Sequence, residues 1–311
     1  MNSLFIIFIL SMIIGQPQKD EDMLKKIQNN AISIKKKKNN TLDKKFAQAK
    51  SLERSGLYEE AFSLFKEINR ENPGITKYFQ PLKNYLRQIE SWDTLLVYTQ
   101  YYANVRKQDF QSQLELLDLF IWMDDESRWQ EIAFRLTQIQ IANDNSMKIV
   151  IQRLINNGKY DFAYKQLKKY RQNTGSKDYY SIEMGTFFGM RMTYDKAVQE
   201  YLLYLETHPQ QLQTISDRIL AFPDTPKNME TITYILLKSE LKTAQFILAD
   251  LRFKQKFYDE GYEILKYNDA PPVMLLNYAK DLASVKEYAK AEKILTAIIN
   301  FGVNDQMATQ A

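Results

Sequence analysis

The sequence contains no cysteine and only one histidine, His208. The absence of cysteine excludes disulfides, thiol nucleophiles and most structural zinc sites. His208 stands directly before Pro209, a typical position for a helix end, so we interpret it as structural. A catalytic or metal-binding role for this one imidazole is the alternative.

Glycine and proline are scarce as well, with 9 and 8 residues among 311. Antiparallel sheets joined by tight turns need more of both residues. The long segments between them are rich in Leu, Ile, Lys, Glu and Gln, which favour helices. The composition therefore predicts an all-α protein.

Charge is nearly balanced, with 42 basic and 38 acidic residues and a formal net charge of +4. Much of the excess lies in one run, Lys35–Lys38. A run this short is typical of a solvated linker, and binding of nucleic acid or anionic lipid is the alternative. We expect no nucleic-acid partner.

An apolar segment, Leu4–Ile14, precedes the polar part of the chain and is broken only by Ser11. It is too short to span a bilayer as a helix, but it matches the hydrophobic part of a secretory signal, with Gly15 as the candidate cleavage residue. An uncleaved membrane anchor and an apolar start without a targeting role are the alternatives. We predict a signal peptide or anchor at 1–15, a polar linker at 16–41 and a repeat domain at 42–311, in a secreted or periplasmic protein with a membrane tether as the alternative.

A short pattern recurs along the rest of the chain. It reads glycine, any residue, an aromatic residue, two further residues and a small one, as in Gly56–Ala61 and Gly158–Ala163. The steps from Ala61 to Leu95 and from Ala163 to Ala197 are both 34 residues. Tyr194–Ala197 and Tyr288–Ala291 repeat the aromatic and the small residue, and weaker copies with a small or aliphatic residue three positions later begin at Trp92, Trp129 and Tyr258. A constant period of this length indicates a stacked repeat.

Each unit has the apolar spacing of two helices. In the unit from Tyr179 to Thr207, one helical stripe includes Ile182 and Phe188, and a second includes Ala197 and Tyr201. One helix pair cannot bury its apolar stripe alone, so the pairs must stack. The small residue would let two helices approach closely, and the acids after the aromatic residue would favour the start of the second helix.

These residues resemble the tetratricopeptide repeat family. The likeness lies in Gly-x-Tyr-x-x-Ala, in an aromatic residue four positions after the alanine (Phe65 and Tyr201), and in Pro73 and Pro209 at the ends of their units. It is weaker at Trp92 and Trp129 and nearly absent from Leu212 to Glu240. The resemblance implies a right-handed α-solenoid of about eight stacked antiparallel helix pairs.

The sequence offers no recognisable catalytic motif. It has no glycine-rich phosphate loop, no Gly-x-Ser-x-Gly and no paired histidines. The densest acidic cluster, Asp124–Glu126, falls between two helices and is interpreted as a solvated turn. We therefore expect a protein that is not an enzyme and that carries neither a cofactor nor a metal.

The resemblance also implies that the first helix of each pair lines a concave groove that binds a partner peptide or helix. An ordinary solvated face is the alternative for each single residue. The residues on this face that we predict to contact a partner are Lys77, Gln80, Asn84, Arg87, Leu117, Ile121, Lys148, Gln152, Ile182 and Thr186.

Two functions remain open from the sequence. The first is an exported adaptor that holds other proteins in an envelope assembly by binding a protein or peptide ligand. The second is the helical platform of a larger envelope enzyme or secretion component whose catalytic part lies downstream. A cytoplasmic scaffold is a third reading if the apolar start is not a signal.

Overall fold

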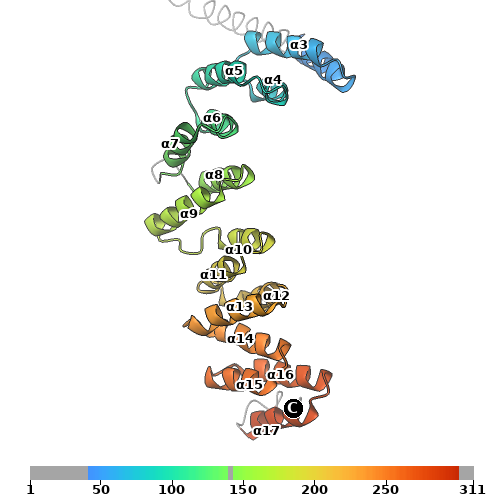
Figure 1. Cartoon of the computed structure of the whole chain (residues 1–311), viewed down its shortest axis with the longest axis vertical. Helices are drawn as coiled ribbons and strands as arrows, with labels where there is room; N and C mark the ends of the chain where they lie inside the picture. Colours follow the sequence, from blue (N-terminus) through green and yellow to red (C-terminus); the bar gives the residue numbers. More distant parts are fainter. Residues whose placement is uncertain (1–40, 139–142, 301–311) are drawn as a thin grey trace, which may run out of the picture. The chain divides into compact units, whose positions relative to one another are not determined.

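The computed structural model describes residues 41–138 and 143–300, and every regular element in these ranges is a helix. A helical segment at residues 41–54 is followed by the α-helices α3 to α17, and together they form eight consecutive pairs (Figure 1). We call the earlier member of each pair the first helix and the later member the second helix. Within these ranges the predicted all-α array of stacked helix pairs is confirmed.

The chain divides into two compact units whose boundary falls within α9, between Gln166 and Leu167. In the first unit, the first helices are residues 41–54, α4 (Thr76–Gln88), α6 (Phe110–Trp122) and α8 (Asp144–Asn156). The second helices are α3 (Tyr58–Glu71), α5 (Trp92–Val105), α7 (Glu126–Leu136) and α9 (Tyr160–Thr174).

In the second unit, the first helices are α10 (Ser181–Met190), α12 (Leu212–Leu220), α14 (Lys242–Lys254) and α16 (Pro272–Ser284). The second helices are α11 (Tyr194–Leu205), α13 (Pro226–Lys238), α15 (Tyr258–Tyr267) and α17 (Tyr288–Asn300), and a short 3₁₀ turn, η1 (Pro209–Gln211), precedes α12. Across the described part of both units, no helix combines the length and apolar character needed to cross a bilayer.

The recurring aromatic residue marks the start of most second helices. Tyr58, Trp92, Tyr160, Tyr194, Tyr258 and Tyr288 are the first residues of α3, α5, α9, α11, α15 and α17. Acids follow in the first turn of five of these helices, for example Asp93 in α5 and Asp195 in α11. A carboxylate there faces the positive end of the helix dipole, as the sequence pattern predicts.

The small residue three positions later lies where two helices approach most closely. Ala61, Ala163 and Ala197 are buried. On α10, a Cβ at Gly185 would lie 2.5 Å from the ring of Tyr201 in α11, and a Cβ at Gly261 would lie 2.2 Å from the hydroxyl of Tyr278. Both distances are too short for a real Cβ, so a larger residue at either position would force a tyrosine side chain or a helix to shift.

The turn inside most pairs has one repeated geometry. The residue two positions before the aromatic residue has a left-handed backbone, with φ of 80° at Gly56, 75° at Gly158 and 58° at Met192. In the α10–α11 turn, the amide of Met192 donates to the carbonyl of Gly189 and that of Thr193 to the carbonyl of Phe188, both at 3.0 Å. This pair of bonds is the Schellman motif that ends a helix.

The turn geometry yields a stability prediction. Met192 is 76% exposed, so its side chain adds little packing, while its left-handed backbone costs a non-glycine residue about 1 kcal/mol. We expect Met192→Gly to raise the free energy of unfolding by roughly 0.5 kcal/mol after the entropy of the unfolded glycine is subtracted. Chemical denaturation followed by circular dichroism would measure the change.

Gly158→Ala is the matched reverse change, because nothing lies within 4 Å of the added Cβ and only the backbone strain is altered. It should lower stability by about 1 kcal/mol. A stabilised Gly158→Ala variant would contradict this account of the turns.

Candidate partner-binding surfaces

The predicted residues on α4 lie at the surface, but most of them already contact other parts of the first unit. The ammonium of Lys77 lies 2.8 Å from the Asp43 carboxylate. Gln80 donates to Glu115 at 2.9 Å, and the guanidinium of Arg87 lies 4.2 Å from the ring centre of Trp122. Asn84 is exposed. The α4 face is therefore partly committed to internal contacts.

On α6 the predicted placement is wrong. Leu117 and Ile121 are buried, with 0% and 8% of their surfaces exposed, so they form core rather than groove. The error has a physical cause: α6 packs against both α5 and α7, and its sequence is apolar around most of its circumference. A helix of that kind is buried on all sides instead of along one stripe.

The remaining predicted residues are accessible to different degrees. Lys148 and Gln152 of α8 and Thr186 of α10 are exposed, whereas Ile182 is half-buried. The Thr186 hydroxyl accepts a hydrogen bond at 3.1 Å from Arg218, which lies on the next first helix, α12. Contact of these residues with a partner stays a prediction.

A buried polar network that the sequence reasoning missed joins the first helices of the first unit. Lys83 of α4 lies 2.5 Å from Glu115 of α6, and the two side chains are 7% and 1% exposed. Asp118 of α6, also 1% exposed, lies 2.5 Å from Arg153 of α8. Burial raises the pKa of Asp118, and the positive charges of Arg153 and Lys83 oppose that rise.

Neutral groups complete this network. Asn157 donates to Asp118 at 3.3 Å and accepts from the indole of Trp122 at 3.0 Å. Lys83 and Glu115 are 32 positions apart and Asp118 and Arg153 are 35 apart, about one repeat in each case. One signal in the sequence could have revealed this network: the acids Glu115 and Asp118 stand isolated within the apolar sequence of α6.

In the second unit, the first helices α12, α14 and α16 border a cavity of about 620 Å³, with one residue of α15 also in its lining. Its walls are largely apolar and include Phe246, Phe253 and Met274. Two carboxyl groups, of Asp250 and Asp281, also face it. The cavity is therefore an apolar groove with a local negative charge.

Asp250 is the less solvated of the two acids. Its carboxylate accepts a 2.7 Å hydrogen bond from the hydroxyl of Ser216. Burial, together with the negative charges of Asp281 and Asp217, raises the pKa of Asp250 to about 6, although the hydrogen bond from Ser216 acts in the opposite direction. Burial also raises the pKa of Asp281.

The lysine at the rim of this groove is already engaged. The ammonium of Lys254 lies 2.6 Å from both the Leu220 carbonyl and the Asp224 carboxylate. Among the described residues, the structure shows no ion pair between a cation and either Asp250 or Asp281. The groove thus differs from the α4–α6–α8 network, where each buried acid has a basic partner.

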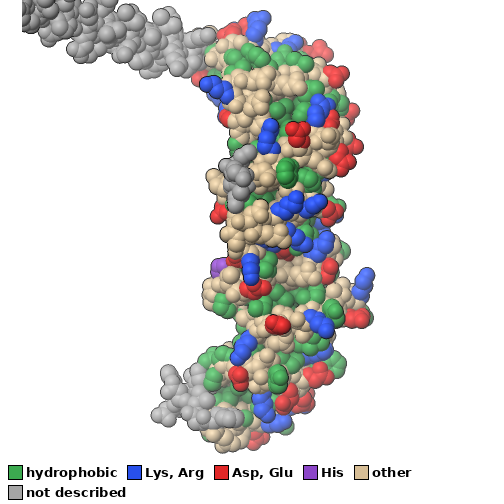
Figure 2. All heavy atoms as spheres, turned by 90° about the vertical axis from the view of Figure 1, so that its left-hand side faces the viewer, with side chains coloured by type: hydrophobic (Ala, Val, Ile, Leu, Met, Phe, Trp, Pro, Cys, Tyr) green, Lys and Arg blue, Asp and Glu red, His purple; other side chains and the backbone are tan. Residues whose placement is uncertain are grey.

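The surface carries both signs of charge in small areas. On the face shown in Figure 2, basic, acidic and apolar side chains of the described residues are interspersed, without one broad region of a single sign. In residues 41–138 and 143–300 no group of three or more Asp, Glu or His side chains is arranged to hold a metal ion. We therefore expect short-range contacts, rather than a long-range electrostatic field, to govern any binding on this face.

In the comparisons with known proteins, matches to this chain were found only among solved structures. No family profile and no curated protein matches the chain. The C-terminal part of a TPR repeat-containing protein from Cytophaga hutchinsonii is 13% identical, with 85% of this chain and 98% of that chain covered and a TM-score of 0.29. The TPR2AB-domain of yeast Sti1, solved as a pHSP90-complex, is 15% identical, with 88% and 98% covered and a TM-score of 0.29.

The buried network yields a second stability prediction. Lys83→Met would leave the Glu115 carboxylate buried without its cation, and removing one partner of a buried pair costs roughly 3–5 kcal/mol. Replacing both, as Lys83→Met with Glu115→Leu, should recover most of that loss. Urea unfolding of the single and double variants would give the two values.

Lys77→Met is the matched control, because its ion pair with Asp43 is more than half exposed on both sides. Exposed pairs contribute about 1 kcal/mol or less, so this variant should remain close to the parent protein. Equal losses for Lys83→Met and Lys77→Met would show that burial of the network does not matter to stability.

Proposed function

We propose that this chain is a protein-interaction scaffold whose α12–α14–α16 groove binds a partner segment with a lysine or arginine beside apolar side chains. The observation that carries the proposal is the pair of carboxyl groups, Asp250 and Asp281, set in an apolar cavity without a cation of their own. A positively charged partner side chain would supply the missing charge. Its apolar neighbours would cover Phe246 and Met274.

The location agrees with the general expectation from the sequence and refines its detail. The groove lies on first helices, where the resemblance to tetratricopeptide repeats implies binding, but its residues differ from the ten predicted ones. A buried or half-buried carboxylate that meets a guanidinium gains a charge-assisted hydrogen bond, which is stronger than a neutral one. Binding would therefore depend on a basic residue in the partner's sequence, and not on the partner's size alone.

The cost of leaving Asp250 without a cation can be checked through pH. Its pKa of about 6 in the folded chain exceeds the value near 4 of an unfolded aspartate, so the folded state holds the extra proton between these values. Stability should then fall as pH rises from about 4 to about 6 and stay lower above that range. Asp250→Asn should remove this fall and make the protein more stable at pH 7 by roughly 1–3 kcal/mol.

Binding should follow the opposite trend. A random twelve-residue peptide library selected on the full chain should yield peptides with a basic residue beside apolar ones. Their affinity should increase between pH 5 and pH 7 as Asp250 ionises, and Asp250→Asn with Asp281→Asn should weaken them at least tenfold. Fluorescence anisotropy with synthetic copies of the selected peptides would give the affinities.

The control variant, Glu230→Gln with Glu263→Gln, makes the same change in net charge on exposed second-helix positions. It should leave those peptides bound. Selected peptides without basic residues, or basic peptides that bind the two double variants equally, would overturn the proposal.

Export is a separate proposal. The apolar segment from Leu4 to Ile14 and the polar linker lie outside the described residues, so it rests on the sequence pattern alone. We expect mass spectrometry of the native protein to find either a chain that starts after Gly15 or an intact chain in the membrane fraction. An intact Met1 on a chain recovered wholly from the cytoplasmic fraction would refute it.

A further inference from the structure

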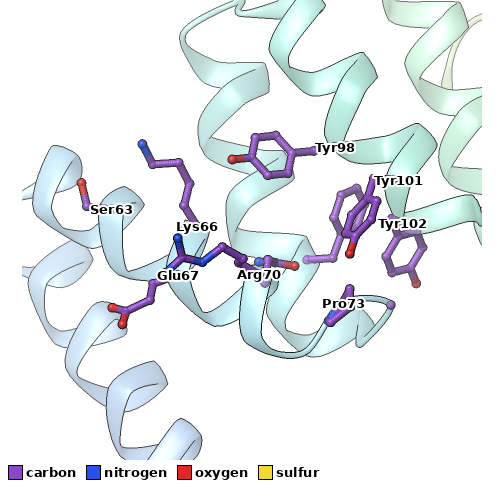
Figure 3. A pocket seen from close by; sticks show the side chains of 11 residues that line it. Ser63, Lys66, Glu67, Arg70, Pro73, Tyr98, Tyr101 and Tyr102 are labelled. Carbon is purple, nitrogen blue, oxygen red and sulfur yellow. The ribbon is translucent and has the colours of Figure 1, made fainter. Parts of the chain in front are cut away.

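A second cavity lies in the first unit, between the second helices α3 and α5. Its volume is about 580 Å³, and its lining includes Lys66 and Arg70 of α3 and the three tyrosines Tyr98, Tyr101 and Tyr102 of α5. The turn at Pro73 and Gly74 borders it on one side. Figure 3 shows Tyr98 extending from α5 toward the side of the cavity where Lys66 lies.

Several contacts hold Tyr102, one of the residues that line this cavity, in a fixed position. Tyr102 is 2% exposed, stacks on Phe79 with ring centres 4.2 Å apart, and shares a 2.8 Å hydrogen bond with the hydroxyl of Thr76. The guanidinium of Arg106 lies 5.5 Å from the ring centre of Tyr102 and is ion-paired with Asp109. These contacts fix the aromatic surface before any ligand arrives, which lowers the entropic cost of binding.

The cations in the cavity differ from Arg106. Neither Lys66 nor Arg70 forms an ion pair with an acid in the part of the chain that the structure describes. Glu67 also lines the cavity, but its carboxylate lies 2.8 Å from Lys45 and points away from the tyrosines (Figure 3). The cavity therefore has a local surplus of positive charge.

The tyrosines add hydrogen-bond donors and apolar surface to that charge. Tyr101 is 51% exposed and Tyr98 is half-buried, so both rings are accessible from solvent. A phenol can donate to a carboxylate oxygen, and a guanidinium can donate two parallel bonds to the same group. Exposed aromatic rings beside arginine are also the residues enriched at the centres of protein interfaces.

We propose that the α3–α5 cavity is a second binding site, which takes an acidic peptide segment by pairing a carboxylate with Lys66 and Arg70 and packing an adjacent apolar side chain on Tyr98 and Tyr101. Two cations match one or two carboxylates. They are too few for the several phosphates that a nucleic-acid surface presents. The site lies on second helices and is independent of the groove proposed above.

The peptide selection on the full chain also tests this site, with a different variant. Parent protein should enrich peptides in which glutamate or aspartate stands beside an apolar or aromatic residue, and Lys66→Gln with Arg70→Gln should abolish that enrichment. For a selected peptide, exchanging glutamate for glutamine should weaken binding to the parent at least tenfold. The same exchange should change little for the variant, because its cations are gone.

Two further variants separate binding from folding. Tyr101→Ala removes an exposed ring and should weaken the acidic peptides several-fold while leaving the salt dependence of binding unchanged. Lys227→Gln with Lys266→Gln makes the same charge change at exposed positions of the second unit and should have no effect. Circular dichroism should be the same for all of these variants.

The outcomes distinguish this site from the other proposal. Acidic peptides that need Lys66 and Arg70 support it, whatever becomes of the peptides that need Asp250 and Asp281. Acidic peptides that bind the parent and the Lys66→Gln, Arg70→Gln variant equally overturn it. Competition by inorganic phosphate with no enrichment of acidic peptides would also overturn it, in favour of a site for small anions.

Discussion

The close approach of helices at small residues in most pairs is the constraint on which the rest of this fold depends. A Cβ at Gly185 or at Gly261 would overlap a tyrosine side chain of a neighbouring helix, and a buried alanine follows the aromatic residue by three positions in several pairs. Helices that approach so closely exclude water between them. Each first helix also contacts the preceding and following pairs, so a large part of its surface becomes interior, most of all on α6.

That burial determines what polar side chains on first helices can do. On α6, Glu115 and Asp118 cannot reach bulk water, and each meets a cation about one repeat away, Lys83 or Arg153. On α14, Asp250 is half-buried and meets a hydroxyl, Ser216, 34 positions before it and another acid, Asp281, 31 positions after it. Glu115 and Asp118 therefore have cations of this chain beside them, whereas Asp250 has a second acid. This difference indicates that Asp250 contacts a binding partner rather than another part of the chain.

The sequence predicts the fold well because the fold has a period. Aromatic residues such as Tyr194 and small residues such as Ala197 recur at intervals that a single stack explains, and the structure places them at helix starts and at close approaches. The surface was harder to predict. Assigning Leu117 and Ile121 to a groove assumed one buried stripe for each first helix, whereas α6 is buried nearly all round. Neither cavity could be predicted, because each joins side chains one repeat apart whose rotamers no spacing rule fixes.

Satisfied and unsatisfied charges separate structural polar groups from candidate binding groups in this chain. Arg171 and Glu200 are both buried and joined by two parallel hydrogen bonds of 3.0 and 2.7 Å, and Arg171 also donates to the Tyr179 carbonyl. The two charges of this pair neutralise each other within the chain, so the pair is not a candidate binding group. Asp250 and Arg70 lack a partner of opposite charge, and they lie in cavities whose charges have opposite signs. Because partial burial of the Asp250 carboxylate without a cation costs stability, its place in a fold that elsewhere pairs its buried acids is better explained by binding than by folding.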